Sequence, residues 1–377
     1  MDKWIKEDHE YMERALKLAK KGLGRTNPNP MVGAVIVKEG KILGEGYHGY
    51  YGGPHAEVVA LEKAGEAAQG ATMYVTLEPC CHHGKTPPCV EKIIEEGIKR
   101  VVIAALDPNA NVAGKGMKKL QAAGIKTESG LRANEAIRQN EIFRKYIVTG
   151  RPFVASKWGM SLDGKIATKA GESQWITSER ARMDGHKLRA QMAAILVGIG
   201  TLQEDNPLLS CRHPEYTYHD PMRIVLDSHL NIAMGTKLMK TAEEIPTIVA
   251  TLDRYELNES KKEKIAAIES AGAECWYLPP DKNGRIDLIS LMDKLGNQNI
   301  DSVLIEGGAT LHGAAVHESI VDKFVAYIGN VVIGGERAPS PVGGEGIDRL
   351  SEGIRLQEIK WETMEDSIKI TGYPTHN

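Results

Sequence analysis

A histidine, a glutamate and two cysteines in this chain have the types and spacing of a catalytic metal site. His55 and Glu57 are separated by one residue, and Cys80 and Cys89 follow further along the chain. One His and two Cys are good zinc ligands, and three protein ligands leave the fourth tetrahedral position to water. Zinc lowers the pKa of such a water to about 7. A nearby carboxylate such as Glu57 can then carry protons as a general acid and base. We therefore expect hydrolytic chemistry.

The order of these residues narrows the reaction. Zinc-dependent nucleobase deaminases place one His, a Glu that is not a ligand, and two Cys in an H-x-E…P-C-x-x-C pattern. Here Pro79 directly precedes Cys80, as the pattern requires. We therefore expect Glu57 to take a proton from water and deliver it to a departing amine.

The spacing between the two cysteines differs from that general pattern. Eight residues, 81–88, separate Cys80 from Cys89, where two are usual. This loop contains Cys81, His82 and His83, which are all chemically able to bind zinc. We favour Cys80 because it follows a proline, and Cys89 because it opens an apolar stretch, while the three loop residues remain alternatives.

The segments around these residues alternate between helix and strand patterns. Helices are expected at about 7–21, 55–63, 90–96 and 133–146, and strands at 31–37, 44–47, 71–77 and 101–106. The helix at 55–63 is expected to bury Val58, Val59 and Leu61. Alternation of this kind predicts a three-layer α/β domain. Residues 44–49 match G-x-G-x-x-G, but no helix opens there, so we interpret these glycines as loop residues.

A turn-rich junction near residues 146–152 predicts a domain boundary, giving domains 1–147 and 148–377. In the second half, the segments 193–201 and 303–311 each run from an apolar strand into a glycine-containing turn and a helix. A helix N-terminus after such a turn suits a phosphate or pyrophosphate. Each turn alone is equally compatible with a tight connection that binds nothing, and the pair favours a nucleotide cofactor.

Composition excludes several function classes. The chain has 377 residues and a net charge of −3, whereas nucleic-acid-binding proteins usually carry a strongly basic face. No apolar run approaches the roughly 20 residues that span a bilayer, and the charged first residues do not form a signal peptide. Five cysteines, two of them assigned to metal, do not suggest a disulfide framework. We expect a cytoplasmic enzyme that binds neither nucleic acid nor membrane.

Short motifs recur through both halves of the chain. They are at 27–33, 53–57, 77–80 and 84–89 in the first half, and at 161–165, 171–177, 188–190, 205–207 and 306–308 in the second. These motifs resemble those of the bifunctional deaminase/reductase family of riboflavin biosynthesis, and the resemblance covers nearly the whole chain. The long cysteine loop is normal for this family, although Cys81 stands where a small polar residue is expected.

The resemblance implies a fold, an activity and an assembly. The N-terminal domain would be a cytidine-deaminase-like three-layer α/β/α domain, and the C-terminal domain a dihydrofolate-reductase-like α/β domain. The first would use Zn²⁺ to deaminate 2,5-diamino-6-ribosylamino-4(3H)-pyrimidinone 5′-phosphate. The second would use NADPH to reduce the ribosyl group, giving 5-amino-6-ribitylamino-uracil 5′-phosphate. Homo-oligomers are also implied.

The same resemblance assigns roles to individual residues. His55, Cys80 and Cys89 would hold zinc, with Glu57 as the proton carrier. Lys157 would act near the site of hydride transfer. NADPH-contacting positions would be Gly159, Trp175, Thr201, Asp205, Ser228, Gly308, Ala309, Thr310, Leu311, His312, Gly313 and Ala314. Substrate-contacting positions would be Asn29, His48, Lys85, Asp107 and Asn109 in the first half, and Ser173, Arg189, Leu209, Arg212 and Glu306 in the second.

Two other functions remain open from the residues alone. One is a deaminase for a different nucleotide or a tRNA base, followed by an unrelated domain; the long cysteine loop and the charge balance disfavour it. The other is a protein in which zinc only holds the fold. A fourth protein ligand from the cysteine loop would support that reading.

Overall fold

The computed structural model describes residues 3–81, 88–109, 112–216, 220–252 and 258–375. It divides into two compact units, Met1–Gly150 and Arg151–Asn377. Lys85, His82 and His83 lie outside the described residues. In the described part of the chain, no helix has the length and apolar character needed to cross a membrane.

The first unit is built on a five-stranded mixed sheet with the order β2-β1-β3-β4-β5. β1 pairs antiparallel with β2 and β3, and β3, β4 and β5 run parallel. The strands are β1 Gly33–Lys38, β2 Lys41–Tyr47, β3 Thr72–Leu77, β4 Arg100–Ala105 and β5 Lys126–Ser129. The helices are α1 Lys6–Ala19, α2 Ala56–Ala64, α3 Cys89–Glu95, α4 Lys115–Ala122, α5 Ala133–Gln139 and α6 Glu141–Thr149, with short 3₁₀ turns at Lys20–Gly22 and Gly65–Ala68.

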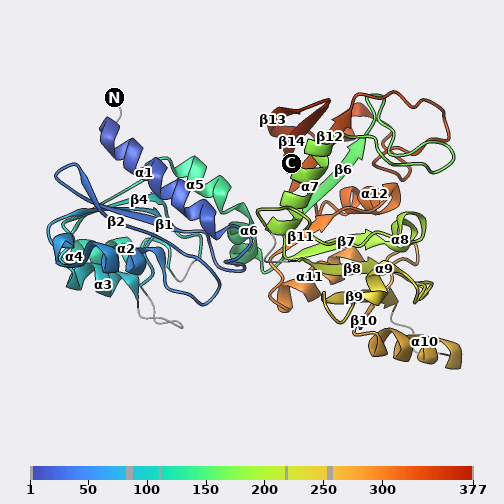
Figure 1. Ribbon diagram of the computed structural model, residues 1–377, viewed down its shortest axis with the longest axis horizontal. Coiled ribbons are helices and arrows are strands. Elements are labelled where there is room, and N and C mark those ends of the chain that lie inside the picture. The colour runs from blue at the N-terminus through green and yellow to red at the C-terminus, as the bar shows by residue number, and fades with distance from the viewer. Residues whose placement is uncertain (1–2, 82–87, 110–111, 217–219, 253–257, 376–377) are drawn as a thin grey trace. The chain divides into compact units, whose positions relative to one another are not determined.

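Helices cover both faces of this sheet, so the predicted three layers are confirmed (Figure 1). α1 and α5 pack on one face through residues that include Met12, Leu16 and Ala136. α2, α3 and α4 pack on the other face. Val35 and Ile36 in β1 point to opposite faces, one into each core, because successive side chains of a strand alternate.

Two details of the first unit correct the sequence predictions. Gly44 and Gly46 lie in β2, which confirms the strand predicted at 44–47 and corrects the interpretation of these glycines as loop residues. A Cβ atom on either would lie 2.1 Å from a backbone oxygen of α2, so the missing side chains let the helix lie against the strand. In α2, Val58 and Val59 are only half-buried, while Glu57 is buried.

The helix predicted at 133–146 is also divided. It breaks at Asn140, between α5 and α6. The Asn140 side chain is buried and exchanges two hydrogen bonds with the backbone of Met31, at 2.8 and 2.9 Å. A side chain committed to another segment in this way favours a helix boundary over a continuous helix.

The second unit contains a nine-stranded sheet with the order β10-β9-β8-β7-β11-β6-β12-β14-β13. The strands from β10 to β12 run parallel, and β14 and β13 are added antiparallel at one edge. The strands are β6 Phe153–Met160, β7 Ala194–Gly198, β8 Met222–Leu226, β9 Thr247–Leu252, β10 Glu274–Leu278, β11 Ser302–Ile305, β12 Lys323–Gly329, β13 Leu356–Met364 and β14 Ser367–Pro374.

Helices in the second unit connect these strands, so two α/β domains are confirmed (Figure 1). The helices are α7 Glu179–Gln191, α8 Ile199–Asp205, α9 Lys237–Lys240, α10 Glu259–Ser270, α11 Leu288–Asn297 and α12 Ala309–His317, with a 3₁₀ turn at Leu350–Glu352. Residues of α11 and α12 form a large apolar core with the central strands. β7 and β11 read as continuous apolar runs because both faces of a central parallel strand are covered.

Candidate active sites

Three predicted zinc ligands converge in the first unit from three separate elements. His55 is the N-cap residue of α2, Cys89 is the first residue of α3, and Cys80 follows β3. His55 Nδ1 lies 3.0 Å from Cys89 Sγ and 3.6 Å from Cys80 Sγ. All three ligand atoms lie within 4.8 Å of one another. Tetrahedral zinc has Zn–S and Zn–N distances of about 2.3 and 2.0 Å, so these separations fit one shared ion.

The charge state of Cys80 also suits zinc, whereas the pKa values of Cys89 and His55 are raised. The pKa of Cys80 is lowered to about 4, chiefly because the Cys89 thiol donates a hydrogen bond to it and His55 lies beside it. The thiolate is the form of cysteine that binds metal. Among the described residues, Cys81 is not part of the ligand cluster; it is buried in the apolar core beneath α2 and α3.

Glu57 is buried in the first turn of α2, two residues from the histidine ligand. Burial raises the pKa of its carboxyl group to about 7. A group whose pKa lies near the working pH can both accept and release a proton during a reaction. The fold therefore places a carboxyl group that is able to carry a proton next to the ligand cluster.

Two predicted substrate contacts also lie at this site. His48 is buried, and its ring packs edge-to-face against that of His55 at a centroid distance of 5.7 Å. His48 Nδ1 lies 3.0 Å from Pro54 O, and its Nε2 lies 3.3 Å from the side-chain nitrogen of Asn29. Since a carbonyl only accepts, Nδ1 carries the proton and Nε2 accepts from Asn29. The hydrogen bond to His48 orients the side-chain amide of Asn29.

A residue that the sequence reasoning missed organises the remaining loop. Glu78 is buried directly after β3. Its carboxylate accepts hydrogen bonds from the backbone N–H groups of Asp107, Gly114 and Met117, at 3.3, 2.9 and 3.1 Å. Asp107 in turn accepts from the backbone of Asn109 at 2.8 Å. Glu78 thus fixes the position of Asp107 and, through it, of Asn109, which are two further predicted substrate contacts. An acidic residue at the end of an apolar strand was the available signal.

The second unit contains a cleft of about 550 Å³ at the carboxyl ends of β6 and β11, the usual address of a ligand site in a parallel sheet. Most of the predicted reductase residues line it: Lys157, Gly159, Ser173, Trp175, Arg189, Thr201, Asp205, Arg212, Glu306, Gly308 and His312.

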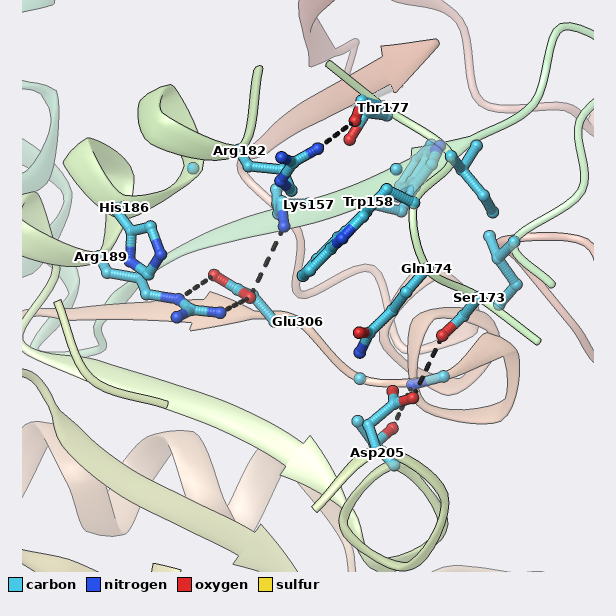
Figure 2. Close-up of a pocket in the computed structure, with 18 of the residues that line it drawn as sticks. Lys157, Trp158, Ser173, Gln174, Thr177, Arg182, His186, Arg189, Asp205 and Glu306 are labelled. Carbon is cyan, nitrogen blue, oxygen red and sulfur yellow. Dashed lines mark hydrogen bonds and ion pairs between the residues drawn. The ribbon is translucent and has the colours of Figure 1, made fainter. Parts of the chain in front are cut away.

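A buried ion-pair network occupies one end of this cleft (Figure 2). Arg189 donates two hydrogen bonds to Glu306, at 2.9 and 2.7 Å, and Lys157 Nζ lies 3.6 Å from the same carboxylate. Burial raises the pKa of Glu306, but the two cations outweigh that effect and hold it well below its ordinary value. Glu306 is therefore a carboxylate at neutral pH.

The other end of the cleft contains the glycine turn and α12. The Gly308 backbone N–H donates to Thr201 Oγ1 at 3.0 Å, which joins the two glycine-containing turns that the sequence singled out. Ser173 Oγ donates to Asp205 at 3.2 Å (Figure 2). Trp175 is 69% exposed, and the Arg182 guanidinium lies 4.4 Å from the centre of its ring. The exposed aromatic face and the N-terminus of α12 fit a dinucleotide such as NADPH.

Several predicted contacts do not line the cleft, and their roles stay predictions. Leu209 is buried and has a left-handed backbone, with φ of 57°. Ser228 follows β8 and accepts a hydrogen bond from Thr251 through its backbone oxygen. Leu311 packs in the apolar core. The other positions of this kind, all on α12, are Ala309, Thr310, Gly313 and Ala314.

The cleft also contains residues that the sequence reasoning did not select. His186 lies one helical turn before Arg189 on α7, and Trp158 and Gln174 adjoin predicted contacts. The spacing of His186 and Arg189, which puts both on one face of a helix, was the signal available for His186.

Comparisons with known proteins assign a family model to each half of the chain. Residues 5–105 match the family model of the cytidine and deoxycytidylate deaminase zinc-binding region, and residues 152–370 match that of the RibD C-terminal domain. The riboflavin biosynthesis protein RibD of Actinobacillus pleuropneumoniae is 45% identical over 96% of this chain and 94% of its own length. That of Escherichia coli K12 is 43% identical over 88% of this chain and 89% of its own.

Solved structures extend the likeness. Acinetobacter baumannii RibD matches with a TM-score of 0.85 and 37% identity, covering 98% of this chain and 99% of its own. A Thermotoga maritima protein, described as a diaminohydroxyphosphoribosylaminopyrimidine deaminase/5-amino-6-(5-phosphoribosylamino)uracil reductase, matches with a TM-score of 0.84 and 36% identity over the same shares.

Proposed function

The chain belongs to the RibD family of riboflavin biosynthesis enzymes, and from this premise we propose which of its residues carry out each of two reactions. It is a bifunctional enzyme, a zinc-dependent deaminase and a reductase. We propose that residues 1–147 carry the deaminase and residues 148–377 the reductase. The observation that carries this proposal is the coexistence of a His/Cys/Cys cluster beside a buried glutamate and a separate cationic cleft.

For the deaminase we propose 2,5-diamino-6-ribosylamino-4(3H)-pyrimidinone 5′-phosphate as substrate. Zinc, when bound by His55, Cys80 and Cys89, supplies a Lewis acid that makes water nucleophilic at neutral pH. Glu57 accepts the proton of the attacking water on its carboxylate and returns it to the leaving amine. The low exposure of Glu57 supports this role because it keeps the proton from exchanging with solvent.

Other residues of the deaminase site bind and orient the pyrimidine. His48 fixes the amide of Asn29, so that the amide oxygen is available to an amino group of the substrate. Asp107 and Asn109 contact the ring or ribose from the loop that Glu78 holds. Lys85, which lies outside the described residues, would contact the substrate from the cysteine loop.

For the reductase we propose that the ribosyl group of the deaminated intermediate is reduced to ribityl. NADPH, when bound, supplies the hydride. Trp175, Thr201, Asp205 and the N-terminus of α12 bind this cofactor, supported by their place in the cleft. Lys157 holds a proton on Nζ beside Glu306 and delivers it to the opening sugar.

The phosphate of the same intermediate is bound at the cationic end of the cleft. Arg189 and Arg212 supply charge and N–H donors there. Ser173, which donates to Asp205 at the other end of the cleft, contacts another part of the substrate. Guanidinium groups suit phosphate because their N–H groups can form paired hydrogen bonds with it.

We also propose that the chain assembles with copies of itself and works in the cytoplasm. The edge strand β13 supports assembly, since it is solvent-exposed along most of its length and includes Ile359 and Trp361, which are 58% and 71% exposed. An exposed apolar edge strand is a template for pairing with another chain. Light scattering of the Trp361→Lys variant tests this, because a smaller particle is expected.

A paired assay tests the catalytic proposal. Wild type and Glu57→Gln receive the diaminopyrimidinone ribotide with and without NADPH, while ammonia release and nicotinamide absorbance are followed. Wild type should release ammonia and then oxidise NADPH, and the variant should do neither unless given the deaminated intermediate. Ammonia release by the variant would exclude Glu57 as proton carrier. No NADPH oxidation by wild type with the intermediate would overturn the reductase proposal.

A further inference from the structure

His186 lies at the cationic end of the reductase cleft (Figure 2). A hydrogen bond to its ring defines which ring nitrogen carries the proton. The backbone N–H of Arg212 donates a hydrogen bond to His186 Nδ1, at 3.2 Å. Because a backbone amide can only donate, Nδ1 carries no proton, and the neutral ring has its proton on Nε2. Within the described ranges, the structure records no partner for Nε2.

The groups around this ring carry excess positive charge. Three cations, Lys157, Arg189 and Arg212, and one carboxylate, Glu306, act on His186 from the lining of the cleft. Asp220 adds a second carboxylate that acts on both arginines, and the cations remain in excess. Burial and these cations lower the pKa of His186 to about 4. At neutral pH the ring is thus an uncharged donor among cations, and it adds no repulsion to them.

We propose that His186 donates its Nε2–H to the phosphate group of the reductase substrate. This inference rests on the reductase function proposed above, and it adds a residue to the phosphate subsite. The excess of cations attracts a phosphate dianion, and its oxygens are strong acceptors for an N–H donor. His186 would therefore favour the phosphorylated intermediate over its dephosphorylated riboside.

The ring is not the only tie between α7 and the segment that carries Arg212. Cys211 Sγ donates to the backbone oxygen of His186 at 3.4 Å, and the Cys211 backbone N–H donates to Asp220 at 2.6 Å. These contacts do not depend on the imidazole. Replacement of the ring thus leaves part of the support of this segment in place, so a role in binding can be separated from a role in folding.

Two replacements of His186 distinguish the roles of its two ring nitrogens. Asn can place its side-chain oxygen near the position of Nδ1, which keeps the acceptor for Arg212 but removes the Nε2 donor. Gln is longer and can place its amide N–H₂ near Nε2, which keeps the donor. His229→Asn is the matched control, since His229 is exposed and does not line the cleft. Each variant is given the phosphorylated intermediate and its riboside, with NADPH in excess.

We expect His186→Asn to raise KM for the phosphorylated intermediate about tenfold or more, as loss of a hydrogen bond to a charged group implies, with little change in kcat or in the riboside reaction. His186→Gln should recover much of this loss. An unchanged KM in His186→Asn would overturn the proposal, as would an equal loss with both substrates. Ammonia release by the same chain monitors the deaminase half, and a melting curve monitors folding of the reductase half. Failure of wild type to oxidise NADPH would instead reject the reductase function itself.

Discussion

Substitution of Glu306 by Gln tests the charge network of the reductase cleft. The change keeps the size of the side chain and removes its negative charge. Arg189 then loses one of two hydrogen bonds to a carboxylate, and Lys157 loses its counterion. We expect reduction of the deaminated intermediate to fall at least tenfold, because the cations that we propose to bind substrate and move a proton are no longer held in place.

The same substitution should lower stability by an amount that can be estimated. Removing one partner of a buried ion pair costs about 3–5 kcal/mol, and the Glu306 side chain is only 7% exposed. Gln still offers one oxygen to Arg189, so we expect the lower end, about 3 kcal/mol. For a domain of 150–250 residues, each kcal/mol corresponds to roughly 2–4 °C. The melting temperature of the reductase unit should therefore fall by roughly 6–12 °C.

The pH dependence provides a further check. The pKa of Glu306 is lower in the folded protein than its ordinary value of 4.5. The contribution of Glu306 to the free energy of unfolding is therefore fully present above the ordinary pKa and is lost as the pH falls toward the folded pKa. The stability difference between wild type and Glu306→Gln should be constant from about pH 8 to 5.5 and should narrow below about pH 4.5.

The assay follows NADPH oxidation with the intermediate supplied, together with melting curves across this pH range. Glu263→Gln is the control, since Glu263 is exposed on α10. Ammonia release should be unchanged in both variants. If Glu306→Gln reduced the intermediate at the wild-type rate and kept the wild-type melting temperature, this ion-pair network would not be what holds the cleft residues in place.

Three further predictions concern the rest of the chain. Glu78→Gln should lower ammonia release about tenfold, because one acceptor for the N–H groups of Asp107, Gly114 and Met117 is lost. Zinc content, measured by atomic absorption, should stay at the wild-type level, and loss of zinc would contradict this explanation. Removal of zinc by a chelator should abolish ammonia release but leave NADPH oxidation with the intermediate intact. Arg223→Met should destabilise the reductase unit by about 3 kcal/mol in urea unfolding, because the fully buried guanidinium pairs with several backbone oxygens that would lose their donor.

Much of the fold could be predicted because its signals are local. The spacing of Met12, Ala15, Leu16 and Ala19 predicts a helix with one apolar face, and all four are buried on α1. The metal pattern is also local, since His55 and Cys89 begin helices that the apolar spacing locates. Val58 and Val59 were misjudged because periodicity shows that a face is apolar but not how closely the sheet covers it.

The sequence by itself determined much of the chemistry available to this protein: a His, Glu and Cys pattern typical of zinc-dependent deaminases follows from residue type and order, and the family resemblance indicated the cationic residues of the second half. Only the tertiary structure decided which of those residues meet. Arg189 and Glu306 are 117 positions apart, and Glu306 meets Lys157 because the sheet order sets β11 beside β6. The free proton position on His186 and the loop held by Glu78 arise in the same way, since a hydrogen bond between distant segments depends on strand order, which no local pattern records.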